Sequence, residues 1–153
     1  MKYKIGDVYK NEAFPNRVST IIDISPNADY DGGLSYFVMD NKNGEITFSV
    51  EYEMQLKEWC EKIDVDLPKY EKLSKEELRR LAKYKIGETY LHTESPDLLY
   101  TIVSVSPVKD FQNRLSYLCE VQDNSGDIWY DVHSEGNMER VLKKVDLNNK
   151  AKE

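Results

Sequence analysis

The chain has 153 residues and a formal net charge of −7, and 40% of its residues are hydrophobic, which suits one compact domain or two small ones. The acidic balance disfavours a general binder of the nucleic-acid backbone, which would carry a basic face. With only Cys60 and Cys119, we expect no disulfide framework and a cytoplasmic location. We also expect no signal segment and no membrane span, because no apolar run approaches about 20 residues.

The chain is a tandem repeat. Residues 2–9 return as residues 83–90 at a spacing of 81, and residues 44–46 return as 126–128 at a spacing of 82, because one residue is inserted in the second copy. Agreement in order across two whole segments predicts a duplication.

This duplication predicts the domain organisation. We expect a first β repeat over residues 1–65, a linker with a short helix over 66–82, a second β repeat over 83–147 and a disordered tail over 148–153. Units of this size lie near the lower limit for burying a core alone, so the two copies should pack on each other or on the linker.

Each copy is predicted to contain four strands. In the first copy, runs rich in β-branched and aromatic residues predict strands over residues 5–9, 18–25 and 34–40, and a fourth strand follows the Asn43-Gly44 turn. In that fourth strand Ile46, Phe48 and Val50 alternate with polar residues and should share one face.

After the fourth strand the hydrophobic spacing becomes helical, which predicts that each copy ends in a short helix. The residues concerned are Leu56, Trp59, Cys60 and Ile63, with Met138, Val141, Leu142 and Val145 at the same offsets. A short turn and a fifth strand are the alternative, because residues 140–142 would also suit an edge strand.

The linker has a clear helix start. Residues 74–77 form a capping box, and Leu73 can staple to Leu78, so a helix is predicted over residues 75–82.

The pattern Lys4-Ile5-Gly6-Asp7-Val8-Tyr9 is similar to the first strand of SH3-like modules, including those common in short proteins of Gram-positive bacteria and their phages. The resemblance implies a mainly β fold (α+β) of two tandem small antiparallel SH3-like sheets. It also implies binding of proteins or nucleic acid more often than catalysis. The helical spacing at the end of each copy departs from this pattern, so an open meander sheet backed by a helix is the alternative to a closed barrel.

The sequence contains no catalytic signature. Cys119, His92 and His133 could be combined on paper into a nucleophile and its base, but we expect a buried thiol and two exposed imidazoles. The isolated Cys and His residues do not match a zinc site, and residues 29–33 lack the downstream acidic ligand of a calcium loop. We therefore expect no enzyme, no metal and no cofactor.

The aromatic residues divide into core and surface candidates. Tyr3, Tyr9 and Tyr36 recur in register as Tyr84, Tyr90 and Tyr117, so we expect them in the core with their hydroxyls near the surface. Trp59 is also expected in the core. Trp129 stands on the polar face of the fourth strand of the second copy, where it either packs between the repeats or anchors a partner.

The acidic residues suggest a binding surface. We expect one face of the first repeat to carry Asp23, Asp29, Asp31, Asp40, Glu45, Glu51 and Glu53, and a comparable region of the second to carry Glu120, Asp123, Asp127 and Asp131. Such rows can imitate phosphates and steer association with a basic protein. A solvated face that keeps the protein soluble is the alternative.

Two functional hypotheses follow. The first is a non-enzymatic intracellular binding protein that engages a protein partner through Trp129, Asp131, His133, Asp29, Asp31 and Glu51. Its specific form is a phage or mobile-element inhibitor of a host nucleic-acid-handling enzyme, with a basic protein as the partner. The second is a nucleic-acid-binding module that uses Lys109, Arg114, Lys143 and Lys144 of the second repeat, with stacking from Tyr30, Phe111 or Trp129.

Overall fold

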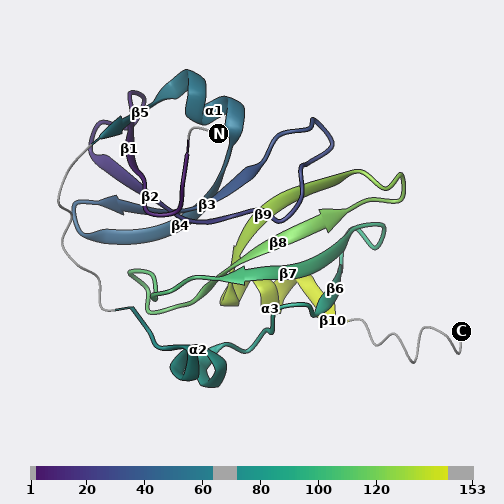
Figure 1. The fold of residues 1–153 in the computed structure, drawn as a ribbon. Coiled ribbons are helices and arrows are strands. Elements are labelled where there is room, and N and C mark those ends of the chain that lie inside the picture. Colours follow the sequence, from purple (N-terminus) through teal and green to yellow (C-terminus); the bar gives the residue numbers. More distant parts are fainter. Residues whose placement is uncertain (1–2, 64–71, 145–153) are drawn as a thin grey trace, which may run out of the picture.

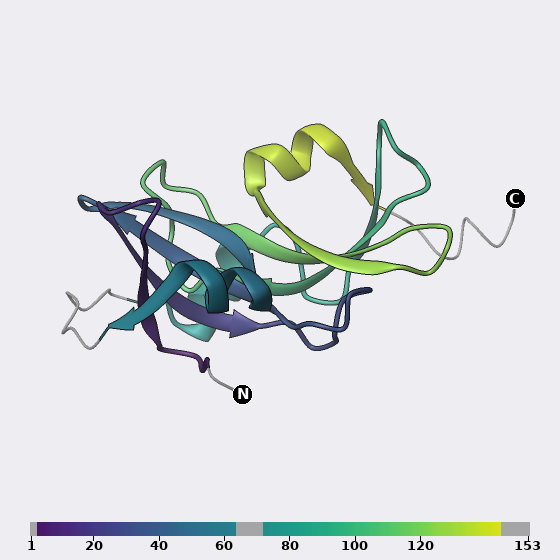
Figure 2. The ribbon, with the colours of Figure 1, turned by 90° about the horizontal axis from the view of Figure 1, so that it is seen from above.

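The computed structural model describes residues 3–63 and 72–144, and these residues form two five-stranded antiparallel sheets and three short helices (Figure 1). The mainly β fold expected from the sequence is confirmed. The sheets lie face to face in the middle of the molecule, and α1 and α3 cover their outer sides (Figure 1). Seen from above, the same two helices are displaced to opposite sides (Figure 2).

The first sheet has the order β4-β3-β2-β1-β5. Its elements are β1 (Val8–Asn11), β2 (Arg17–Ile24), β3 (Ser35–Lys42), β4 (Glu45–Tyr52), α1 (Glu53–Trp59) and β5 (Cys60–Ile63). Among the described strands, β4 and β5 are the two edges of this sheet, because β5 pairs with β1.

The second sheet has the order β10-β6-β7-β8-β9, which repeats the arrangement of the first. Its elements are β6 (Thr89–His92), β7 (Leu99–Val105), β8 (Ser116–Gln122), β9 (Ile128–Ser134), α3 (Glu135–Val141) and β10 (Leu142–Lys144). The expected terminal helix and the alternative fifth strand therefore both occur in each half, one after the other.

The turn between the third and fourth strands differs between the halves. In the first half Asn43 and Gly44 both have positive φ (53° and 91°), as a tight two-residue hairpin turn requires. The insertion in the second half falls in the equivalent turn, residues 123–127 between β8 and β9. The longer turn carries two aspartates, Asp123 and Asp127.

The predicted linker helix is confirmed as α2 (Lys75–Leu81). The Ser74 hydroxyl accepts a hydrogen bond from the Glu77 amide at 3.1 Å, and the Glu77 carboxylate accepts one from the Ser74 amide at 3.2 Å. These two bonds satisfy amides that the first helical turn leaves unpaired. Leu73, Leu78 and Leu81 pack against the core of the second half.

The tyrosine core is confirmed, but the expectation that the hydroxyls lie near the surface was wrong for Tyr9 and Tyr36, whose hydroxyls are buried. The expectation for Trp59 was also wrong. Tyr9, Tyr36 and Tyr117 are almost completely buried, whereas the Trp59 side chain is 57% exposed. Trp59 is the last residue of α1, and the chain turns there into β5. As a result Cys60, rather than Trp59, packs against the core of the first half.

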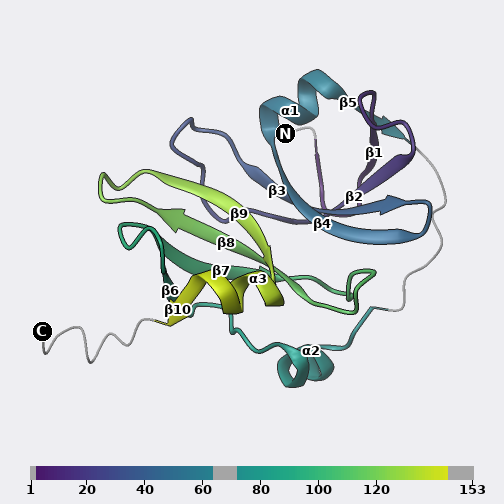
Figure 3. The same ribbon diagram turned by 180° about the vertical axis from the view of Figure 1, so that it is seen from behind.

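A third core cluster joins the two sheets, and it is built from equivalent positions of the two halves. Phe37 and its counterpart Leu118 are fully buried in it, together with Tyr130, the counterpart of Phe48. The view from behind also shows the sheets stacked on each other (Figure 3). The predicted face of alternating apolar residues on the fourth strand, Phe48 and Val50, packs in this cluster.

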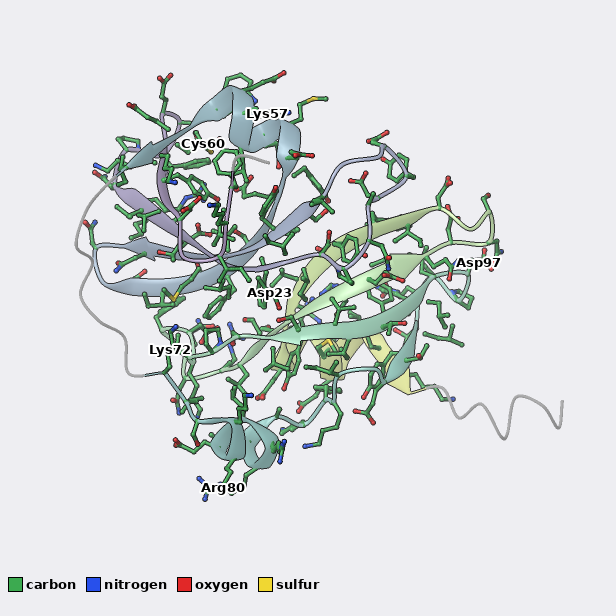
Figure 4. The ribbon with its side chains drawn as sticks, viewed as in Figure 1. Asp23, Lys57, Cys60, Lys72, Arg80 and Asp97 are labelled. Carbon is green, nitrogen blue, oxygen red and sulfur yellow. The ribbon has the colours of Figure 1, made fainter. Side chains whose placement is uncertain are left out.

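Hydrogen bonds across this interface are arranged around an approximate two-fold axis. The Tyr30 amide donates to the Ile128 carbonyl, and the equivalent Phe111 amide donates to the equivalent Ile46 carbonyl, both at 2.9 Å. Ser104 donates to Asp23, its own counterpart, at 2.5 Å, and Asp23 lies between the two sheets (Figure 4). Contacts of this reciprocal kind are typical of a symmetric homodimer, here formed within one chain.

Candidate binding cleft

A cleft with a volume of about 910 Å³ lies at one end of the inter-sheet interface. One wall is the β2–β3 loop and the start of α1, and the opposite wall is the β8–β9 turn with the start of β9; these segments approach each other on the right of Figure 1. It is lined by Asp29, Tyr30, Asp31, Gly32, Gly33, Tyr52, Glu53, Met54, Gln55, Lys57, Asp123, Asp127 and Trp129.

The β2–β3 wall is held by Asp29. Its side-chain Oδ1 accepts hydrogen bonds from the amides of Asp31 at 2.9 Å and Gly33 at 3.2 Å, a turn that aspartate forms with its own backbone. Gly32 takes a positive φ of 84° that side chains rarely adopt. The loop is anchored to the second half by the Tyr30 amide, while the Tyr30 ring is 62% exposed.

The opposite wall is held in the same way. Asp123 Oδ1 accepts from the amides of Ser125 at 2.9 Å and Asp127 at 3.0 Å. Trp129 follows on β9, where it packs partly against the core of the second half. It therefore reaches the cleft from a rigid strand and does not pack between the sheets.

Tyr52 connects the two walls. Its hydroxyl donates to the Tyr130 carbonyl across the interface at 3.4 Å. Burial raises the pKa of Tyr52, and the negative charges of Asp131 and Asp29 raise it further. The phenol therefore stays protonated at neutral pH and remains a hydrogen-bond donor.

The cleft is strongly acidic. Five carboxylates line it, from Asp29, Asp31, Glu53, Asp123 and Asp127, against the single ammonium group of Lys57. No ion pair involving any of these five carboxylates occurs within residues 3–63 and 72–144. Like charges gathered in a concave, partly apolar site focus a negative potential that attracts cations.

The structure brings together three of the six predicted partner-binding residues. Asp29, Asp31 and Trp129 line the cleft, and Asp131, His133 and Glu51 do not. His133 is not the exposed imidazole expected from the sequence: it is 9% exposed, in contact with Asn137 at 2.5 Å and 3.4 Å from the Asp131 carboxylate.

The expected acidic face of the first repeat is not formed as predicted. Asp40 is buried and accepts hydrogen bonds from the hydroxyls of Ser19 at 2.6 Å and Ser49 at 2.7 Å. Glu51 lies 3.9 Å from the Arg17 guanidinium. These side chains point into the first half, because alternate residues of a strand face opposite sides of the sheet. The acidic surface is instead assembled from both halves.

Sequence reasoning missed Tyr52 and Lys57 as lining residues. Both belong to the segment where β4 passes into α1, and only the packing of the two sheets places that segment opposite the β8–β9 turn. One feature of the sequence could have pointed to this cleft, namely the residue that is inserted in the β8–β9 turn of the second copy.

A second groove occupies the equivalent place at the other end of the interface. It has a volume of about 520 Å³ and is lined by Arg114, Val132, Ser134, Gly136, Asn137 and Arg140. The counterpart of Tyr52 here is Ser134, and the counterpart of Trp129 is Thr47. The two related sites therefore differ in charge and in aromatic content.

The residues proposed for nucleic-acid binding are spread over several elements. Lys109 and Arg114 belong to the β7–β8 loop, whereas Lys143 and Lys144 belong to β10. Arg114 lines the second groove, and Lys109 and Lys143 line neither groove.

The candidate catalytic residues are not arranged for catalysis. Tyr100 lies between the two imidazoles, with ring centroids 5.9 Å from His92 and 5.5 Å from His133. Burial raises the pKa of the Cys119 thiol to about 12, which keeps it protonated and a poor nucleophile. In the described part of the chain, no group of three or more His, Cys, Asp or Glu residues is placed to hold a metal ion.

Comparisons with protein-family models, curated proteins and solved structures find no match to this chain. The three helices within residues 3–63 and 72–144 are all too short or too polar to cross a bilayer. The candidate site must therefore be interpreted from its own geometry and charge.

Proposed function

We propose that this is a non-enzymatic binding protein whose acidic aromatic cleft takes a basic segment of a partner protein. The observation that carries the proposal is the set of five carboxylates that form no ion pair with any other described residue, placed beside Tyr30, Tyr52 and Trp129. A cationic side chain that enters the cleft would be attracted both by the carboxylates and by the faces of the aromatic rings.

The aromatic rings determine which cations fit best. The faces of tyrosine and tryptophan attract cations, and a guanidinium also stacks on them and pairs with a carboxylate through two hydrogen bonds. A segment rich in arginine therefore matches the cleft better than a simple ion does. The carboxylates are spread over two walls and do not converge on one point, which also favours an extended basic chain over a metal ion.

The rigidity of the walls supports binding of this kind. Asp29 and Asp123 close the two acidic turns through hydrogen bonds to the backbones of those turns. Because the turns are already ordered, binding of a partner should cost little conformational entropy there. An inhibitor of a basic nucleic-acid-handling enzyme, encoded by a phage or a mobile element, is the specific form that we propose.

We also propose that each half is an SH3-like module. Strand order 5-1-2-3-4 in both sheets, with a short helix between the fourth and fifth strands, supports this resemblance. Loops held by a rigid scaffold often carry binding function, and we propose that role for the β2–β3 loop here.

The nucleic-acid alternative receives less support. Its proposed basic residues lie on separate elements, and the aromatic residues Tyr30 and Trp129 are surrounded by carboxylates, which would repel phosphates. We therefore retain protein binding as the proposal.

The test uses fluorescence anisotropy with a labelled, end-blocked peptide of alternating arginine and glycine. Binding should weaken with added salt, and Trp129→Ala should cost about 2 kcal/mol, or about 30-fold in Kd. Replacing Asp127 by Asn should also weaken binding. Glu61→Gln is the matched control, because Glu61 is exposed on β5 and lies outside the cleft.

A peptide with glutamate in place of arginine serves as the ligand control and should not bind. Equal affinity for Trp129→Ala and the wild type would show that the cleft is not the site. If Glu61→Gln and Asp127→Asn lose equal affinity for the peptide, binding depends on the overall charge of the protein and not on the cleft.

A further inference from the structure

The groove at the other end of the interface has the opposite charge to the acidic cleft. Its lining residues include two guanidinium groups, from Arg114 and Arg140, and no carboxylate. The bulky Tyr52 is replaced by the smaller Ser134, which helps to keep the groove open. Gly136 lies beside Arg114, where an added Cβ would make an ordinary van der Waals contact with Nη1 at 3.6 Å.

Most guanidinium donors in this groove have no acceptor among the described residues. The Arg114 Nε is buried without a hydrogen bond and stays 3.5 Å from the Asp110 carboxylate. Arg140 makes one bond, from Nη2 to the Asn137 Oδ1 at 2.7 Å. Each guanidinium has five N–H donors, so both retain donors for an additional acceptor. The Ser134 hydroxyl accepts the Asn137 amide, which leaves its own proton free to donate.

We propose that this groove binds a carboxylate group, held between Arg114 and Arg140 with the Ser134 hydroxyl as an additional donor. Guanidinium and carboxylate match each other through two parallel charged hydrogen bonds. This site is separate from the acidic cleft, and the inference does not depend on the function proposed there.

A carboxylate fits the groove better than a phosphate does. Asp110 already lies against Arg114 and offsets part of its charge, and the whole chain carries a formal charge of −7. A phosphate, which brings two negative charges to the contact itself, or a nucleic acid would meet more repulsion than a carboxylate group, which brings one. The small number of cations therefore suits a ligand with one negative charge at the contact.

The experiment is an NMR titration of the full chain that follows the side-chain Nε–Hε signals of arginine. The probes are glutarate, inorganic phosphate and a single-stranded oligonucleotide, each at constant ionic strength. Glutarate should shift the Arg114 and Arg140 signals together in a saturable curve. Arg140→Ala should weaken that binding by about fivefold or more, and the double replacement with Arg114→Ala should abolish it.

Arg80→Ala is the matched control, because Arg80 is exposed on α2 (Figure 4) and is not among the residues that line the groove. It should leave glutarate binding unchanged. The proposal is overturned if glutarate gives no saturable shift, or if Arg80→Ala weakens binding as much as Arg140→Ala does. Tighter saturable binding of phosphate or of the oligonucleotide at Arg114 and Arg140 would also overturn it, in favour of a phosphate site.

Discussion

Leu118→Ala tests whether the two halves fold as one unit. Leu118 is fully buried in the cluster between the sheets, beside Phe37 and Tyr130. Removing a fully buried leucine side chain typically costs about 2–5 kcal/mol, since the packed neighbours fill the cavity only in part. In a chain of this size a loss of about 3 kcal/mol lowers Tm by about 6–12 °C. This is a large part of the about 5–15 kcal/mol that holds a domain folded.

The assay is thermal unfolding monitored by tryptophan fluorescence, because Trp59 lies in the first half and Trp129 in the second. Variants with Trp59→Phe or Trp129→Phe allow each half to be followed separately. Both probes should report one lowered transition in Leu118→Ala. Leu56→Ala, in the core of the first half alone, should behave in the same way if folding is cooperative. Separate transitions, with only the Trp129 signal shifted, would refute the inference that the interface joins the halves.

Two further predictions concern buried polar groups. Burial and the charge of Asp40 raise the pKa of Glu51 above its ordinary 4.5, so the folded state holds that proton more tightly than the unfolded chain does. Glu51 thus favours folding at low pH, and this contribution is lost as the pH rises through the raised pKa. Between about pH 4 and about pH 7 the wild type should therefore lose unfolding free energy relative to Glu51→Gln, and a difference between the two proteins that does not change with pH would contradict this. Tyr3→Phe removes a hydrogen bond to the Leu56 carbonyl and should cost about 1 kcal/mol. Tyr36→Phe removes a buried hydroxyl that makes no hydrogen bond to any residue within 3–63 and 72–144, so it should cost less in urea unfolding. A larger cost for Tyr36→Phe than for Tyr3→Phe would contradict the hydrogen bond assigned to Tyr3.

The sequence predicted local features well where a short-range pattern has one physical meaning. The capping box at Ser74 satisfies helix amides within four residues, so it specified the start of α2 without tertiary information. Asn43-Gly44 likewise specified a hairpin turn, because both residues tolerate positive φ. The recurring tyrosines indicated the core, since the same positions were apolar in both copies.

Predictions that depended on direction in space were less successful. Helical spacing placed Trp59 in the core, but α1 ends at that residue and the chain turns away. The aspartates of the first copy suggested one acidic face, yet Asp40 and Asp23 point into a core and an interface. Sequence spacing gives the alternation of side chains along a strand, and it does not say which face meets water.

Duplication, mainly β composition, the succession of the first four strands in each copy and the acidic charge of both copies were determined by the sequence alone, because each depends on residue type and local spacing. The pairing of the fifth strand with the first was not predicted. The tertiary structure alone decided which acidic residues act together. The cleft takes Asp29, Asp31 and Glu53 from one half and Asp123 and Asp127 from the other, and these meet only because the sheets pack around an approximate two-fold axis. Such packing depends on long-range contacts among buried side chains, which no local pattern encodes.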